Sequence, residues 1–183
     1  MSRLPVPATI GETPAASQPQ LDAVKKKVGA VPNLYRLTAH SPAALSGLLG
    51  LSGALGGGTL DPALREQIAL AVAEINGCDY CPAAHSFIGA RSAKLDDAEI
   101  AAARTGTASD PRAAAALRFA TAVVNARGQV SDADLQTVQA AGFSTSEVVE
   151  IVAHVALNTF TNYLNEVART EVDFPAVPAR SAA

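Results

Sequence analysis

Helix-start signals recur along the chain. Ser or Asp stands directly before Pro at Ser41-Pro42, Asp61-Pro62 and Asp110-Pro111, an order typical of a helix N-cap followed by the first helical residue. After the second signal, apolar side chains recur at helical spacing, at Leu64, Ile68, Val72 and Ile75. No segment shows the alternation of apolar and polar residues that indicates a half-buried strand. The sequence therefore predicts an all-α fold.

Further caps and breaks extend this prediction over most of the chain. We expect helices at about 21–29, on both sides of Ser41-Pro42 as far as the glycines at 56–58, and at about 62–75, 78–94, 96–104, 110–128, 131–142 and 144–170. Ser144 followed by Glu147 has the pattern of a capping box.

The first residues differ from the rest in composition. Residues 1–20 contain four prolines among small and polar side chains and show no apolar period, so we expect an extended N-terminal arm that lies on a neighbouring subunit. Residues 21–183 are expected to form a single all-α domain. Alanine makes up about a fifth of the chain, and helices rich in alanine bury little apolar area per residue. We therefore expect copies of the chain to pack together as a homo-oligomer.

Charge and hydropathy argue against two classes of partner. The chain has 14 Lys and Arg against 17 Asp and Glu, so it lacks the basic surface that holds nucleic acid. No stretch approaches the ~18–20 apolar residues of a membrane span, and the first residues lack the apolar region of a signal peptide. We expect a cytoplasmic protein that binds neither nucleic acid nor a membrane.

Three chemically reactive side chains stand close together at Cys78, Cys81 and His85. On a helix they share one face, and Cys81 and His85 are neighbours one turn apart. A free thiol, with a pKa of ~8.5, is mostly protonated at neutral pH, whereas the thiolate is the nucleophile. A histidine that shares the proton of Cys81 would activate this thiol. Cys78 can reach Cys81 but not His85, so it suits the role of a resolving thiol.

Several roles near this motif stay open. Glu66 and Glu74 are both candidates to orient His85, and their spacing does not choose between them. Tyr80 either lines the entrance to the thiol or packs in the core. Besides dithiol chemistry, the motif is compatible with inert buried thiols, or with a zinc site completed by His40 or His154. Otherwise His154 is expected to be a satisfied core or interface histidine, and His40 the end of a helix.

A polar stripe recurs on the last predicted helix. Asn158, Asn162 and Asn165 follow one another at spacings of four and three residues, so they share a face of the helix. We expect them either to form hydrogen bonds across a subunit interface or to face the solvent.

The spacing of Glu66, Cys78, Tyr80, Cys81 and His85 resembles the signature of the alkylhydroperoxidase D (AhpD)-like branch of the carboxymuconolactone decarboxylase family. The match is specific over about residues 61–91, and VPNLYRLTAHSP, DPRAAAALRFA and TNYLNEVARTEVDFP also resemble peroxidase-related members, so the likeness covers most of the chain. One departure is Tyr80, which stands where the best-studied hydroperoxidases carry a second histidine. The resemblance implies an AhpD-like helical bundle that assembles as a homotrimer or homohexamer.

The resemblance also implies a reaction. Cys81 would be the peroxidatic cysteine, and Cys78 would donate a proton and then form the disulfide. Glu66 and His85 would form the proton relay. The implied electron donor is an external dithiol protein, thioredoxin-like or dihydrolipoyl-bearing, and no metal or organic cofactor is implied. We therefore expect a thiol-dependent peroxidase that reduces organic hydroperoxides or hydrogen peroxide.

Two alternative functions remain. In the first, the dithiol is a switch in a redox-responsive regulatory or binding module. In the second, His85 and Glu66 act as acid and base in a lactone decarboxylase-like enzyme. The cysteine pair argues for the thiol branch, because members named for decarboxylation generally lack it.

Overall fold

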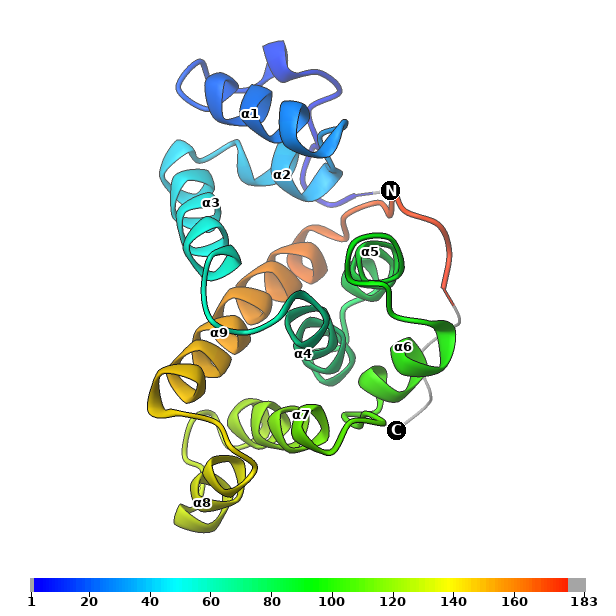
Figure 1. Cartoon of the computed structure of the whole chain (residues 1–183). Coiled ribbons are helices and arrows are strands. Elements are labelled where there is room, and N and C mark those ends of the chain that lie inside the picture. Colours follow the sequence, from blue (N-terminus) through cyan, green and yellow to red (C-terminus); the bar gives the residue numbers. More distant parts are fainter. Residues whose placement is uncertain (1, 178–183) are drawn as a thin grey trace.

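The computed structural model describes residues 2–177, and within this range the chain consists of helices and connecting segments with no strand (Figure 1). The prediction of an all-α fold is confirmed. The α-helices are α1 (Gln18–Val28), α2 (Asn33–Thr38), α3 (Pro42–Gly56), α4 (Pro62–Ile75), α5 (Tyr80–Ile88), α6 (Asp97–Arg104), α7 (Pro111–Asn125), α8 (Asp132–Ala140) and α9 (Thr145–Ala168). A 3-10 turn (Ile10–Glu12) precedes α1, and a π-helical turn (Gly89–Ala93) extends α5.

The helix starts predicted at Ser41, Asp61, Asp110 and Ser144 are those of the structure. The side chains of Ser41, Asp61 and Asp110 each accept a hydrogen bond from the backbone N–H three residues later. At the start of α9, Ser144 and Glu147 form the reciprocal hydrogen bonds of a capping box. These bonds satisfy backbone donors that have no partner within the helix, so each signal works locally, independent of what the helix packs against.

Helix α4 is the centre of the molecule, and α5, α6, α7 and α9 surround it (Figure 1). The buried surface of α4 is wider than the predicted apolar stripe, because Gln67, Leu70 and Ala73 are buried as well as Ile68. Ile75, the last residue of that stripe, is 38% exposed and ends α4.

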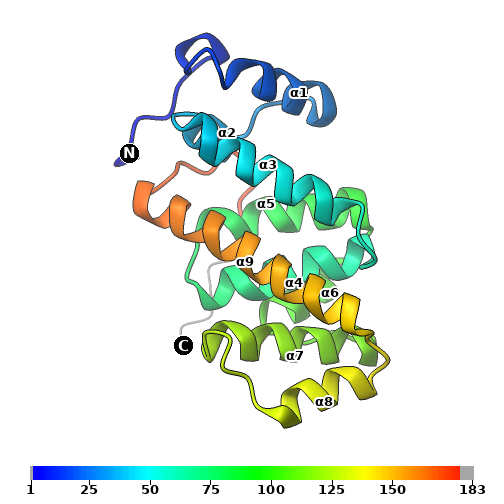
Figure 2. The ribbon, with the colours of Figure 1, turned by 90° about the vertical axis from the view of Figure 1, so that its left-hand side faces the viewer.

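The N-terminal segment lies against its own chain. The Arg3 backbone N–H donates to the carbonyl of Ala168 at 2.6 Å, and the Ser17 hydroxyl, which is fully buried, donates to the carbonyl of Ala39. Figure 2 shows the segment beside α2 and the C-terminal end of α9. The segment is not extended throughout, because it contains the 3-10 turn and α1 begins at Gln18 instead of residue 21.

The segment that follows α9 turns back across α2 and α5. Asp173 accepts hydrogen bonds from the backbone N–H of Asn33 at 2.8 Å and from the phenol of Tyr80 at 2.7 Å. The Phe174 ring packs edge-on against Tyr80, with 5.7 Å between the ring centroids, and also contacts Phe87. This segment therefore covers the start of α5.

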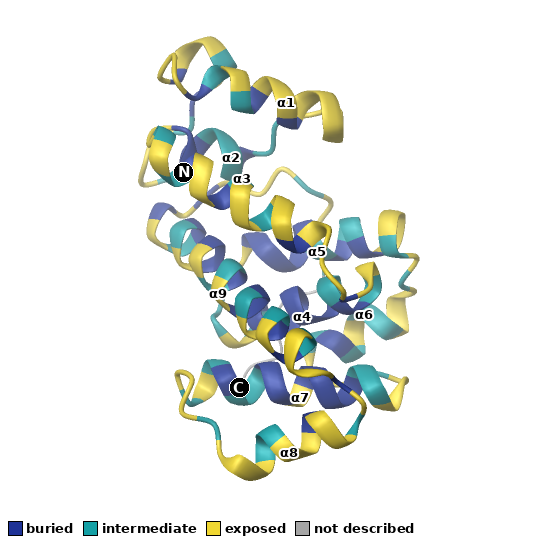
Figure 3. Ribbon diagram, turned by 60° about the vertical axis from the view of Figure 1, so that its left-hand side comes forward, coloured by how far each residue is buried: buried dark blue, intermediate teal, exposed yellow. Residues whose placement is uncertain are grey.

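Helix α9 carries an exposed apolar face. Val149, Phe160, Tyr163 and Val167 are all at least 42% exposed, and Figure 3 shows exposed residues alternating with buried ones along this helix. A contiguous exposed apolar surface is unusual for a monomer and is typical of interaction sites. Within the described residues, no single helix has the length and apolar character that crossing a membrane requires, although the bent pair α8 and α9, at 117°, meets both criteria together.

Candidate functional site

The two cysteines lie at the junction between α4 and α5. Gly77, with a φ of 72°, ends α4, and the backbone N–H of Cys78 donates to the carbonyl of Ala73, a Schellman-type termination that glycine favours. Cys81 follows in the first turn of α5, directly before Pro82, which is tolerated there because an N–H in the first turn has no helical partner. The chain therefore reverses between the two cysteines.

The two sulfur atoms are in direct contact. Both cysteines are free thiols; Cys78 is fully buried and Cys81 is 3% exposed. The Cys78 thiol donates to Cys81 Sγ across 2.7 Å, and the backbone N–H of Cys81 donates to Cys78 Sγ at 3.2 Å. The structure thus brings together the pair that the sequence motif suggested, and places it in the protein interior.

An acid from α4 reaches the histidine on α5. Glu66 Oε2 lies 2.8 Å from His85 Nδ1, and the two side chains are only 20% and 23% exposed. Glu74, the other candidate, instead forms an ion pair with Arg104 at 3.0 Å. Gly89 packs beside this pair: a Cβ at this position would lie 3.8 Å from Glu66 Cβ, an ordinary contact, and 3.2 Å from Leu95 Cδ1, a tight one.

The site favours a charged histidine and a charged thiol. Burial alone would lower the pKa of His85, but the charge and hydrogen bond of Glu66, and then Cys81, raise it above its ordinary value. The pKa of Cys81 falls to about 7, chiefly because Cys78 donates to its sulfur; burial opposes this, and the charge of His85 adds to it. The pKa of Cys78 is raised, first because its proton is held by Cys81 and second by burial. The two thiols therefore differ: Cys81 ionises readily and Cys78 holds its proton.

The asparagine stripe of α9 is buried, and Asn162 and Asn165 in it act on the Cys81 thiol, which corrects both expectations for the stripe. Asn158, Asn162 and Asn165 are at most 4% exposed and are buried within their own chain. The Asn165 Nδ2 donates to Cys81 Sγ at 3.3 Å. The reason is the path of α9, which packs against both α4 and α5. The spacing of the asparagines was a signal in the sequence, because polar residues at helical spacing in an apolar helix indicate buried polar partners. The spacing did not identify those partners.

Tyr80 both packs and lines a cavity. Its ring is 3% exposed and its phenol donates to Asp173 while accepting from the backbone N–H of Leu34 at 3.4 Å. Burial and the bond to Asp173 raise its pKa, so the phenol stays protonated. Asp173 was missed by the sequence analysis, because it stands 93 residues from Tyr80 and no local pattern marks it.

A cavity of about 180 Å³ adjoins His85. Its wall is mainly apolar and aromatic, with Tyr35, Tyr80 and Phe174 among the rings, and the polar side chains of Asn158 and Thr161 on the α9 side. Neither cysteine lines it. His85 therefore contacts this cavity, whereas Cys81 does not.

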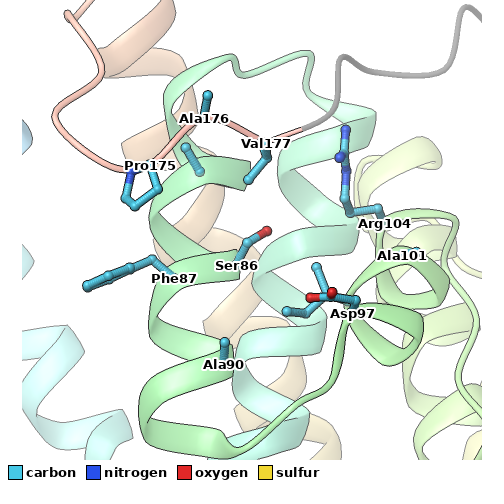
Figure 4. Close-up of a pocket in the computed structure, with 11 residues that line it drawn as sticks. Ser86, Phe87, Ala90, Asp97, Ala101, Arg104, Pro175, Ala176 and Val177 are labelled. Atoms are coloured by element: carbon cyan, nitrogen blue, oxygen red, sulfur yellow. The ribbon is translucent and has the colours of Figure 1, made fainter.

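A second cavity, of about 400 Å³, lies on the other side of α5, against α6 and residues 175–177. Figure 4 shows the hydroxyl of Ser86 directed into it, with Asp97 and Arg104 on the facing helix. It contains neither the cysteines nor His85, so it is separate from the reactive cluster.

The other histidines do not join the cysteines. His40 Nε2 is 2.8 Å from the carbonyl of Pro5 near the surface. His154 is a core residue, as expected, but it is not satisfied: its Nε2 is buried without a hydrogen-bond partner among the described residues. Burial lowers its pKa. Within residues 2–177, no three His, Cys, Asp or Glu side chains are grouped as metal ligands would be.

Comparison with known proteins agrees with this arrangement. Residues 42–122, from α3 to α7, match the model of the carboxymuconolactone decarboxylase family. This segment, slightly less than half of the chain, is similar to that family. The predicted family resemblance is thus confirmed, and within it the chain carries the Cys78, Cys81 and His85 cluster. None of the curated proteins is similar enough in sequence to match the chain.

Solved structures share the AhpD-like fold over nearly the whole chain. A peroxidase-related protein from Ralstonia eutropha JMP134, described as an alkylhydroperoxidase AhpD core, is 28% identical, with a TM-score of 0.84 over 94% of this chain and 92% of that one. A peroxidase-related protein from Silicibacter sp. TM1040 is 23% identical, with a TM-score of 0.80 over 93% and 91%. The debrominase Bmp8 is 22% identical, with a TM-score of 0.73 over 87% and 89%. The last two are likenesses of fold alone.

Proposed function

We propose that the chain is a thiol-dependent peroxidase that reduces organic hydroperoxides or hydrogen peroxide. The observation that carries the proposal is the contact between the Cys78 and Cys81 sulfurs, one helical turn from a histidine bound to Glu66. The fold shared with peroxidase-related proteins supports an antioxidant oxidoreductase. The contrast between a readily ionised Cys81 and a protonated Cys78 is what a nucleophile and its resolving partner require.

The first half-reaction oxidises Cys81. Its thiolate attacks the terminal oxygen of the peroxide, the O–O bond breaks, and Cys81 becomes a sulfenic acid. The leaving alkoxide takes a proton from His85, whose charge Glu66 maintains. The product is an alcohol, or water when the substrate is hydrogen peroxide.

The second half-reaction forms the disulfide. Cys78 gives up its proton and its sulfur attacks the Cys81 sulfur, and the sulfenic hydroxyl leaves with that proton as water. An external dithiol then restores both thiols and is itself oxidised to a disulfide. We propose a thioredoxin-like or dihydrolipoyl-bearing protein as donor, and a reducing cytoplasm as the compartment. The cycle needs no metal or organic cofactor.

The test is the consumption of an alkyl hydroperoxide in excess dithiol. We expect Cys81→Ser to abolish turnover and Cys78→Ser to allow sulfenic acid formation without an internal disulfide. Ser86→Ala is a matched control on the same helix, because Ser86 lines the other cavity, and it should turn over like the wild type. If Cys81→Ser retained wild-type turnover, the assignment would be wrong. If the wild type consumed one peroxide per disulfide and then stopped with donor present, the chain would be a redox-responsive module.

One observation favours a second candidate. His85 and Glu66 are partly exposed and His85 lines a cavity, whereas the thiols are buried. The pair is therefore accessible as an acid and a base for a lactone decarboxylase-like reaction. This candidate predicts an activity that survives Cys78→Ser and Cys81→Ser but is lost in His85→Gln.

We also propose that copies of the chain associate through α9 as a homotrimer or homohexamer. The exposed face of Val149, Phe160, Tyr163 and Val167 supports this. Light scattering tests it: a monomer at micromolar concentration would contradict it, and Tyr163→Lys with Val167→Glu should dissociate the assembly.

A further inference from the structure

Two carboxamides from α9 converge on the reactive sulfur. The Asn165 Nδ2 donates directly to Cys81 Sγ at 3.3 Å. One turn earlier, the Oδ1 of Asn162 accepts a hydrogen bond from the Nδ2 of Asn76 at 2.9 Å. Since that bond occupies the oxygen end of the Asn162 carboxamide, the side chain is held with its amino group as the remaining donor. Both asparagines are completely or almost completely buried, at 0% and 1% exposure.

These two side chains are not satisfied with the thiol in its neutral form. The Asn162 Nδ2 and the Asn165 Oδ1 are buried and have no hydrogen-bond partner among the described residues. A buried polar group without a partner destabilises the folded protein, and an apolar side chain of similar shape would avoid this. Stability alone therefore does not explain two such asparagines in the centre of the molecule.

Ionisation of the neighbouring thiol does explain their Nδ2 groups, because a thiolate accepts hydrogen bonds from both; the Asn165 Oδ1 is an acceptor and gains no partner from it. A neutral thiol is a weak acceptor, whereas a thiolate is a strong one that accepts several hydrogen bonds. Both carboxamides act on Cys81 in the direction of the anion. A donor that forms a weak hydrogen bond to the neutral thiol and a strong one to the thiolate stabilises the charged form selectively. A preorganised site promotes reactivity in this way.

We propose that Asn162 and Asn165 form a two-donor site that binds the anionic sulfur of Cys81, with Asn76 positioning Asn162. The inference rests on the proposed function, in which Cys81 is the reactive thiol. It adds two residues of α9 to a cluster that otherwise comes from α4, α5 and the turn between them. In this arrangement the asparagines hold the nucleophile, and they take no part in proton transfer.

The experiment measures the pKa of Cys81 directly. In a Cys78→Ser background, which leaves Cys81 as the only thiol, the pH dependence of thiolate absorbance and of alkylation by iodoacetamide is followed. We expect Asn165→Leu and Asn162→Leu each to raise the pKa of Cys81 by about one unit, and the double variant to raise it further. Asn76→Ala should give a smaller rise, because it removes only the bond that orients Asn162.

The matched control is Asn158→Leu. Asn158 stands on the same helix and is equally buried, but its Nδ2 donates to the carbonyl of His154 and not to a sulfur, so the pKa of Cys81 should not move. At pH values above the shifted pKa, the alkylation rate of the Asn165 and Asn162 variants should return to that of the Cys78→Ser background. In a variant whose site had collapsed, the rate would not return to that of the background. Circular dichroism confirms that each variant is folded.

The inference is overturned if neither Asn165→Leu nor Asn162→Leu moves the pKa of Cys81, or if Asn158→Leu moves it equally. Its failure is distinguishable from that of the proposed function, because the measurement uses no peroxide. A wild type that does not reduce peroxides, with variants whose thiol pKa has risen, contradicts the peroxidase and leaves the thiolate site intact. Normal peroxide turnover in the wild type, with variants whose thiol pKa has not moved, supports the peroxidase and contradicts the two-donor site.

Discussion

Glu66 on α4 and His85 on α5 are held 2.8 Å apart, carboxylate oxygen to Nδ1, and each is about four-fifths buried. His85 of this pair lines the cavity, and its charge also lowers the pKa of Cys81. The charge and hydrogen bond of Glu66, together with Cys81, raise the pKa of His85 against the effect of burial, so an imidazolium beside a thiolate is favoured here.

Removal of the Glu66 charge should lower the pKa of His85. In Glu66→Gln the hydrogen bond can remain, but the charge that raises the pKa of His85 is gone. We expect the His85 pKa, followed by NMR titration, to fall, so that the imidazole becomes neutral at a lower pH than in the wild type. Glu74→Gln breaks the ion pair with Arg104 instead and should leave the His85 titration unchanged; an equal fall in both variants would contradict the specific role of Glu66.

The reactivity of Cys81 should follow its own ionisation. Because its pKa is lowered to about 7, the alkylation rate of the wild type should rise through that pH and level off above it, and each unit below it should reduce the thiolate fraction about tenfold. Cys78→Ala removes the thiol that donates to Cys81, whereas Cys78→Ser keeps a donor. The alanine variant should therefore show a higher Cys81 pKa than the serine variant, and equal values would exclude Cys78 as the main cause of the lowered pKa.

Tyr80→Phe should loosen the segment after α9. The variant keeps the ring packing against Phe174 but removes the hydrogen bond to Asp173. We expect a loss of about 1–2 kcal/mol in the free energy of unfolding, measured with denaturant, and faster proteolysis after residue 170. Tyr163→Phe, at a side chain that is 55% exposed, serves as the control and should change neither quantity.

Gly58→Ala should destabilise the connection between α3 and α4. A Cβ at residue 58 would lie 2.5 Å from the carboxylate of Glu150, which accepts hydrogen bonds from the backbone N–H groups of Thr59 and Leu60. We expect a loss of about 1–3 kcal/mol in the free energy of unfolding. At the neighbouring Gly57 the nearest atom to such a Cβ is 3.7 Å away, so Gly57→Ala should cost clearly less in the same denaturation experiment.

The helices could be predicted from the sequence because their signals are short in range. Ser41, Asp61 and Asp110 each cap a backbone N–H three residues away, so the local sequence contains both the donor and the acceptor. The same holds for Cys78 and Cys81, which are joined by one turn of chain.

The rest of the site depends on contacts that the local sequence does not contain. Asn165 reaches Cys81 across 84 residues, and Asp173 reaches Tyr80 across 93. Glu66 could be preferred to Glu74 by family resemblance only, since the choice depends on how α4 is rotated against α5 and on the position of Arg104. Helical spacing indicated that the asparagines share a face, but the path of α9 decides what that face meets.

The burial of both sulfurs also limits how electrons can reach them. Cys78 has no exposed surface and Cys81 has 3%, and the segment that contains Asp173 and Phe174 lies over the start of α5. A globular donor cannot bring its own thiol to such a depth unless that segment moves aside, and the cavity beside His85 is lined by neither cysteine. In a thiol cycle at this site, the oxidant and the reductant would both need a movement of the protein that opens the way to Cys81.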